Sequence, residues 1–114
     1  MDETDDAERT CDGAISLAFS ILGKRWNGMI LEVLGAGPIS FAALRRAVVG
    51  ISDAMLSDRL TELADAGLIV REVEPGPPVS VTYSLTSAGC ELMPVLRKLG
   101  AWASENLTIT PART

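Results

Sequence analysis

The stretch "GISDAMLSDRLTELADAGLIVREVEPGPPVSVTYSLT", residues 50–86, decides the fold. Ser52 is a good helix N-cap, and leucines then recur at steps of three and four residues, at Leu56, Leu60 and Leu63. Gly67 is a typical helix stop. Apolar and polar residues then alternate on both sides of "EPGPP". We therefore predict a helix followed by two strands, at 70–73 and 79–85, joined by a rigid loop.

Further helices are predicted on both sides of this stretch. We expect residues 14–22 to form a helix with two apolar faces. A second helix is expected to begin at Lys24-Arg25-Trp26 and to end at "GAGP". Ser40 caps a short third helix. Thr86 caps a long final helix, in which Pro94 should produce a kink or mark a late start.

This order predicts a mainly α fold with a small β-hairpin (α+β): a winged helix-turn-helix with flanking N- and C-terminal helices. At 114 residues the chain is large enough for one core. We expect an acidic flexible tail at 1–10, the folded domain at 11–105, and a disordered tail at 106–114.

Composition excludes several kinds of chemistry. Histidine is absent, which removes Ser-His-Asp, Cys-His and His-based zinc sites. No Gly-rich phosphate loop appears, so we expect no enzyme, cofactor or metal. Two cysteines without an export signal do not indicate disulfides, and no apolar run reaches the roughly 20 residues of a membrane span. A cytoplasmic protein without a membrane partner is the default expectation.

A net charge of −5 opposes DNA binding, yet its distribution is uneven. Residues 1–10 hold five acids and one arginine, a net charge of −4, which leaves −1 for residues 11–114. The folded part is therefore nearly neutral. The pattern favours double-stranded DNA as the partner, while a protein-interaction module that does not bind DNA stays the alternative.

Candidate DNA-binding residues follow from helix geometry. Opposite the buried leucines lie Ala54, Ser57, Asp58, Thr61 and Asp65. The small side chains among them, with Ser52 at the helix start, allow close approach to bases. The phosphate candidates are Lys24, Arg25, Arg45, Arg46 and Arg59. Ser40 and the wing residue Ser80 complete the set. Ordinary surface charge is the alternative interpretation for any single basic residue.

The reading helix is acidic, and each acid has its own interpretation. Asp53 in the first turn favours the helix dipole, whereas Glu62 and Asp65 belong to a solvated face. Asp58 is expected to pair with Arg59 or Arg46; the alternatives are that it accepts from a cytosine amine or repels the DNA backbone.

The residues also resemble the HxlR-type winged-helix transcriptional regulators of bacteria and archaea. The matching pieces span about residues 11–103 and are Cys11, Gly23-Lys24-Arg25-Trp26, Gly37-Pro38, Leu44-Arg45-Arg46, "GIS..LS.RL.EL...GL..R", Tyr83-Ser84-Leu85-Thr86 and Pro94-Val95-Leu96. The chain departs from the usual pattern at Asp12, Ala54, Asp58 and Ser80.

The resemblance implies a homodimer that binds a pseudo-palindromic operator, with its outer helices, 14–22 and 87–103, between the subunits. It also implies that the fourth helix lies in the major groove. The outer helices carry more apolar surface than one small domain can cover. We therefore expect four of their residues at the subunit interface: Leu17, Ile21, Leu96 and Trp102. No small-molecule effector is specified by the sequence.

Some members of the family sense electrophiles or oxidants through the cysteine that matches Cys11. Here Arg9 and the helix start favour a reactive thiolate, whereas Asp12 opposes it. A redox sensor and a partly buried inert thiol are both open for Cys11. Cys90 is expected to serve packing.

Overall fold

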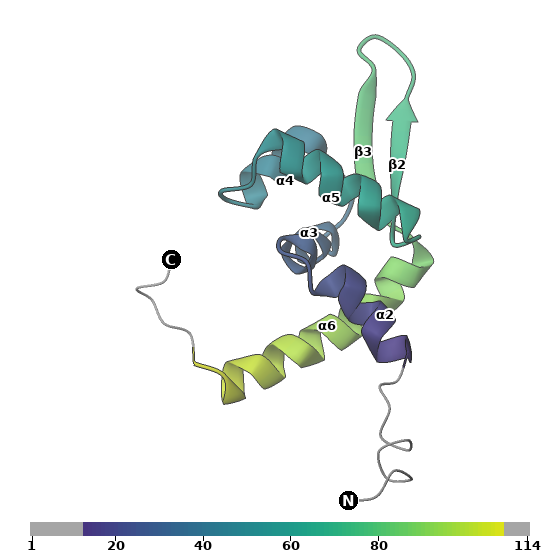
Figure 1. The fold of residues 1–114 in the computed structure, drawn as a ribbon. Coiled ribbons are helices and arrows are strands. Elements are labelled where there is room, and N and C mark those ends of the chain that lie inside the picture. Colours follow the sequence, from purple (N-terminus) through teal and green to yellow (C-terminus); the bar gives the residue numbers. More distant parts are fainter. Residues whose placement is uncertain (1–12, 109–114) are drawn as a thin grey trace, which may run out of the picture.

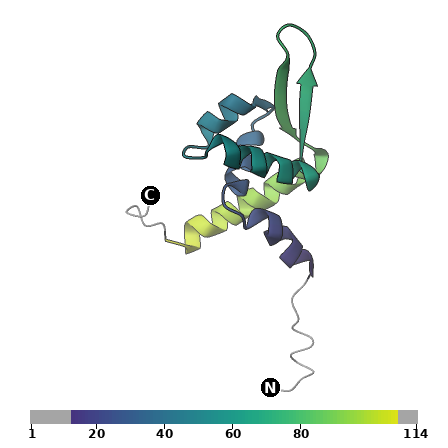
Figure 2. The same cartoon turned by 45° about the horizontal axis from the view of Figure 1, so that its top comes forward.

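The computed structural model describes residues 13–108, and Figure 1 shows their arrangement. The elements, in chain order, are α2 (Gly13–Leu22), α3 (Asn27–Leu34), β1 (Ile39–Ser40), α4 (Phe41–Ala47), α5 (Asp53–Asp65), β2 (Ile69–Glu74), β3 (Ser80–Leu85) and α6 (Ser87–Asn106). Helices α4 and α5 and the β2–β3 hairpin lie on one side, and α2 and α6 lie on the other (Figures 1 and 2). The predicted fold class is confirmed.

The three predicted N-caps are all formed. The hydroxyls of Ser40, Ser52 and Thr86 accept from backbone N–H groups three residues onward, at 3.1–3.2 Å. The hydroxyl of Thr86 also donates to the carbonyl of Gly67 at 2.6 Å. Since Gly67 follows α5 with a φ of +82°, this bond ties the end of α5 to the start of α6.

The sheet has three antiparallel strands in the order β1-β3-β2. The hairpin was predicted, but β1 was not. Ile39 pairs with Tyr83 and Ser40 with Thr82. A strand of two residues has no periodicity to detect, so only the long-range pairing with β3 reveals it.

One expectation about the helices is wrong. The second helix begins at Asn27, because Trp26 has a φ of +83° and cannot continue a right-handed helix. Lys24 and Arg25 therefore lie in the α2–α3 connection. Of the two effects expected of Pro94, a kink or a late start, the late start does not occur, since α6 runs unbroken from Ser87 through Pro94, whose side chain is exposed.

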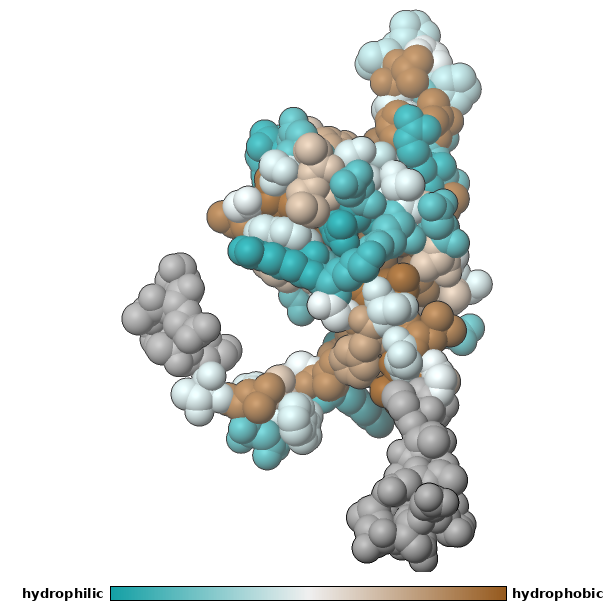
Figure 3. Space-filling view, viewed as in Figure 1, coloured by the Kyte–Doolittle hydropathy of each residue, from teal (hydrophilic) through white to brown (hydrophobic). Residues whose placement is uncertain are grey.

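The core lies between α3, α4, α5, the start of β2 and the first half of α6. Its fully or nearly fully buried apolar side chains are Ile30, Leu31, Leu34, Leu44, Val48, Ile51, Leu56, Leu60, Leu63, Ile69 and Met93. The predicted leucine stripe of α5 is therefore buried. Helix α2 contributes no buried residue, and hydrophobic patches remain visible along α2 and α6 (Figure 3).

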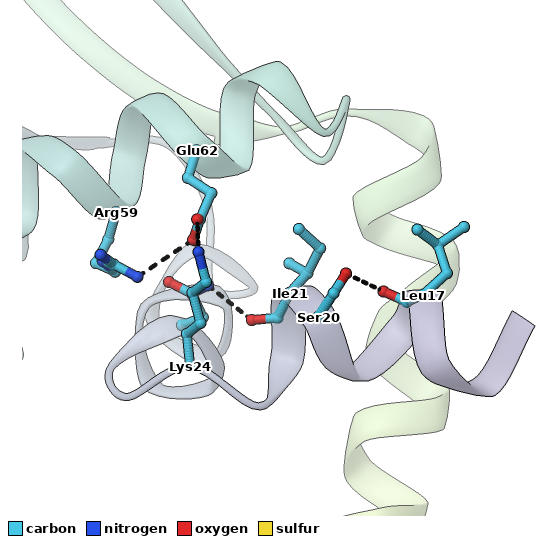
Figure 4. Close-up of polar contacts among 7 residues, drawn as sticks. Leu17, Ser20, Ile21, Lys24, Arg59 and Glu62 are labelled. Atoms are coloured by element: carbon cyan, nitrogen blue, oxygen red, sulfur yellow. Dashed lines mark hydrogen bonds and ion pairs between the residues drawn. The ribbon is translucent and has the colours of Figure 1, made fainter. Parts of the chain in front are cut away.

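A polar cluster joins the α2–α3 connection to α5 (Figure 4). One oxygen of the Glu62 carboxylate pairs with Lys24. The other accepts from the Asn27 amide at 3.1 Å and from the Arg59 guanidinium at 3.3 Å. Asn27 is fully buried, and its amide also donates to the carbonyl of Ile21 at 2.7 Å. The expectation that Glu62 lies on a solvated face is wrong, because Asn27 of α3 and Lys24 of the α2–α3 connection hold its partly buried carboxylate.

The surroundings of Glu62 favour its charged form. Hydrogen bonds from Lys24 and then Asn27 lower the pKa of the carboxyl below its ordinary value, and partial burial opposes them only weakly. A depressed pKa in the folded state means that ionised Glu62 stabilises the fold. That stabilisation is present above the ordinary pKa of 4.5 and is lost as the pH falls through the folded-state pKa.

We predict that Glu62→Gln lowers the free energy of unfolding by about 1 kcal/mol near neutral pH. This value lies between the contribution of an exposed ion pair and that of a buried hydrogen bond to a charged group. The deficit should shrink below pH 4.5, where wild-type Glu62 also becomes protonated. Urea unfolding across this range measures it. Glu74→Gln on the exposed hairpin is the matched control and should change little. A deficit independent of pH would contradict the assignment.

Candidate nucleic-acid interface

The outward side of α5 is as predicted from its periodicity. Its exposed side chains opposite the leucines are Ala54, Ser57, Asp58 and Thr61, and Ser52 caps the same end. None of the first three turns carries a long side chain on this side. A surface of small residues allows another molecule to approach the helix backbone closely.

The first acidic residue of α5 is paired. Asp53 lies 2.9 Å from the Nε of Arg45, which belongs to the last turn of α4. Both side chains are about half exposed or more, so the pair itself contributes little stability. Its effect is electrostatic, because the negative charge of Asp53 partly cancels the positive charge of Arg45, a predicted phosphate ligand, at the α4–α5 turn.

Asp58 has no ion-pair partner among residues 13–108, so the expected pairing with Arg59 or Arg46 is wrong. Arg59 turns instead toward Glu62, one helical turn further along α5. Asp58 is exposed, and its charge is uncompensated on the outward side of the helix.

The predicted phosphate ligands differ in whether a carboxylate of the protein holds them. Lys24 and Arg59 point toward Glu62, on the side of α5 that faces the α2–α3 connection (Figure 4). Arg25 stacks on the Trp26 ring, 4.6 Å from its centroid. Arg46 is exposed on α4 and has no carboxylate partner within the described chain. Arg46 is thus the predicted ligand with the most freedom to meet an anion.

Two residues that sequence reasoning missed lie beside α5. Arg71 and Tyr83 are cross-strand partners in the hairpin. They line a hollow of about 270 Å³ together with residues of α5: Ser57, Leu60, Thr61, Ala64 and Asp65. The alternation of β2 was the available signal, because it places Arg71 on the same face of the hairpin as Tyr83. By contrast, Ser80 pairs with Glu74 at the far end, where no basic residue occurs.

A second surface of interest covers α2 and α6. An apolar hollow of about 480 Å³ is lined by Leu17, Ile21, Leu22, Leu68 and Leu92. Leu96 lines another, of about 580 Å³, between α3 and α6. Leu17 is 70% exposed and Trp102 53% exposed. Such apolar surface on a single chain is typical of a contact with another molecule.

The two cysteines lie in different parts of the chain. Cys11 lies outside the described residues, as do most of both expected tails. Cys90 is exposed near the start of α6, so the expectation that it serves packing is wrong. Its side chain lies at the surface because α6 turns its neighbour Gly89 toward the carbonyl of Leu68.

Other kinds of site find no support in the described part of the chain. Residues 13–108 contain no group of three or more side chains that could hold a metal ion. Within the same range, no helix is both long and apolar enough to cross a bilayer.

Comparison with known proteins identifies the family of the chain. An HxlR-like helix-turn-helix family model matches residues 21–110. The HTH-type transcriptional regulator YodB of Bacillus subtilis is 44% identical over 88 residues, which cover 77% of this chain and 79% of YodB.

Two solved structures extend the comparison to the fold. The reduced form of YodB from B. subtilis superimposes with a TM-score of 0.80 at 40% identity, covering 86% of this chain and 96% of that one. The oxidized form of the redox regulator HypR gives 0.76 at 29% identity, covering 84% and 99%. The chain therefore belongs to the HxlR-like helix-turn-helix family, whose members are transcriptional regulators and not enzymes.

Proposed function

We propose that this regulator is cytoplasmic and binds double-stranded DNA as a homodimer at a pseudo-palindromic operator. The observation that carries the proposal is the outward side of α5, where small exposed side chains follow a well-formed N-cap. The N-terminal half of such a helix is the part that enters the major groove in helix-turn-helix proteins.

Base recognition is assigned to this half of α5. The hydroxyls of Ser57 and Thr61 reach base edges, and the methyl of Ala54 suits contact with a thymine methyl. Ser52 and Ser40, at two helix N-termini, supply N–H groups and hydroxyls for phosphates. Short side chains at these positions demand a close approach, so shape and steric fit contribute to specificity.

Affinity must come from few cations. Lys24 and Arg59 hold Glu62, and Arg45 shares its charge with Asp53. Arg46, with Arg25 and Arg45 in support, remains for the phosphates on either side of the groove. Each phosphate neutralised adds about 0.9 to the slope of log affinity against log salt, so we expect a shallow slope for each subunit.

A second copy of the chain accounts for the apolar side of the molecule. Two-fold pairing through α2 and α6 covers Leu17, Ile21, Leu96 and Trp102 in both subunits at once. It also places two α5 helices on the same side of a duplex, at half-sites about one helical turn, roughly 34–36 Å, apart.

Selection of bound sequences from a random DNA pool tests the proposal. We expect enrichment of an inverted repeat whose half-sites are about 10 base pairs apart. A pool without any enriched sequence, for a folded dimer, would instead identify an interaction module that does not read DNA.

We predict that Asp58→Asn binds every DNA sequence more tightly, because it removes an unpaired carboxylate from the reading side of α5. Binding titrations on the selected operator and on single-base variants measure the change. If the substitution leaves overall affinity alone but abolishes preference at one C·G pair, Asp58 reads a cytosine amine and the repulsive role is wrong.

We predict that Leu17→Asp converts the dimer to monomers, since it places a charge in the apolar hollow between α2 and α6. Sedimentation velocity measures the mass, and circular dichroism checks that the fold is retained. Val79→Asp, at a 63% exposed apolar position on the hairpin, is the matched control and should leave the dimer intact. A Leu17→Asp protein that dimerises as tightly as wild type would exclude this interface.

A response to oxidants or electrophiles through Cys11 is the regulatory part of the proposal, supported by relatives such as the redox regulator HypR. We predict that diamide or a quinone weakens operator binding and that Cys11→Ser abolishes the response while basal binding persists. Cys90→Ser is the control and should respond like wild type. A Cys11→Ser protein that still responds would place sensing elsewhere.

A further inference from the structure

We propose that Asn27 is a positioning residue that determines which spacing of operator half-sites the dimer accepts. The inference rests on the proposed function and deepens it, because it names the side chain through which the subunit contact at α2 fixes the reading helix. Since Asn27 is fully buried, it can touch neither DNA nor a second subunit. It acts through two other residues, Ile21 on α2 and Glu62 on α5.

Helix α2 needs a directional contact to fix its angle. None of its residues is buried, and Ile21 and Leu22, at its end, are the ones that pack against the core. Apolar packing has little directional preference. The carbonyl of Ile21 accepts from the Asn27 amide at 2.7 Å and from the backbone N–H of Lys24 at 3.4 Å. The shorter of these bonds therefore holds the end of α2 to a buried side chain of α3.

The same amide nitrogen also holds α5. It donates to the Glu62 carboxylate at 3.1 Å. Lys24 and Arg59 also bond to Glu62 (Figure 4), but Arg59 belongs to α5 itself and Lys24 to the partly exposed α2–α3 connection. Of these three partners, Asn27 alone lies on another helix. Glu62 directly follows Thr61 and lies one helical turn after Asp58, so a shift at Glu62 moves the proposed reading surface.

Stability alone does not account for an amide at this position. Among residues 13–108, Asn27 is the one buried polar residue, in a core that is otherwise apolar. Its amide oxygen has no hydrogen-bond partner in that range, and a buried acceptor without a partner lowers stability. Buried polar side chains can fix the register of packed helices at a cost in stability. The two donors of Asn27 suit that role, because they fix α2 relative to α5.

The geometry of DNA turns this contact into specificity. In the proposed dimer, the second subunit packs on α2 and so determines where the end of α2 lies. Since one helical turn is 10–10.5 base pairs and roughly 34–36 Å, one added base pair displaces a half-site by about 3.4 Å and rotates it by roughly 35°. A firm link between α2 and α5 tolerates little of this change, whereas a loose link lets each α5 adjust.

A panel of operator duplexes that differ only in half-site spacing tests the role in the full-length dimer. For the wild type, we expect affinity to fall steeply when one base pair is added or removed. For Asn27→Ala, we expect this penalty to shrink by at least about threefold, because the loss of a coupling contact changes such preferences by roughly twofold to thirtyfold. Titrations at one fixed salt concentration measure the Kd for each duplex.

Two control variants separate positioning from stability. Ile30→Ala truncates another fully buried side chain of α3 but leaves both Asn27 bonds intact, so it should destabilise the fold and keep the wild-type spacing profile. Glu62→Gln keeps an oxygen that accepts from Asn27 and should also keep the profile.

Glu62→Ala removes the acceptor and should relax the spacing preference as Asn27→Ala does. This variant keeps the test decisive if Asn27→Ala fails to fold. The double variant Asn27→Ala/Glu62→Ala should relax the preference no further than either single change, because both break one connection.

Spin labels measure the same effect without DNA. Labels on Asp58→Cys, in a protein that also carries Cys11→Ser and Cys90→Ser, report the distribution of distances between the two α5 helices. We expect Asn27→Ala and Glu62→Ala to broaden this distribution and Ile30→Ala to leave it unchanged. The inference is overturned, while the proposed function stands, if both variants bind the operator with the wild-type spacing profile. A wild type that binds none of the duplexes overturns the proposed function and this inference together.

Discussion

The Glu62 carboxylate fixes how the reading helix sits on the rest of the fold. The leucines of α5 are buried among apolar side chains, and such packing has little directional preference. Hydrogen bonds are directional, and Glu62 accepts from Asn27 on α3, from Arg59 on its own helix, and from Lys24 in the connection. One charge therefore holds three segments in register. Because Asn27 is fully buried, the bond also gives a partner to one of its side-chain N–H donors, which could not reach water. The amide oxygen of Asn27 has no hydrogen-bond partner among residues 13–108.

The same arrangement resolves why so acidic a helix suits a role on a polyanion. Of its four acids, Glu62 is turned inward and Asp53 is paired with Arg45, so two are neutralised within the protein. Asp58 and Asp65 remain, at the outward side and at the end of the helix. The cost is that the neutralising cations are not free for phosphates. For the proposed DNA contact, this arrangement predicts weak non-specific attraction and discrimination that depends on close contact with bases.

The sequence predicted what depends on local chemistry. Three N-caps, the leucine stripe of α5 and the hairpin follow from residue types at fixed short spacings, and all are present. The misses share a different cause. Trp26 adopts a left-handed conformation that its residue type disfavours, and Glu62 finds its partners 35 and 38 residues away. Arg71 was likewise passed over because its neighbours on α5 are brought to it only by the turn at Gly67.

Asn27 also links the proposed subunit contact to the proposed DNA contact. Its amide donates both to the carbonyl of Ile21, at the end of α2, and to Glu62 on α5. The partner-facing helix and the reading helix thus share one buried side chain. In a two-fold dimer, the packing of α2 determines where each Ile21 carbonyl lies. Because the Asn27 amide bonds both to this carbonyl and to Glu62, a shift of α2 changes the position of α5. In the proposed dimer, we therefore expect the distance between the two α5 helices, and with it the spacing of operator half-sites, to depend on how α2 packs.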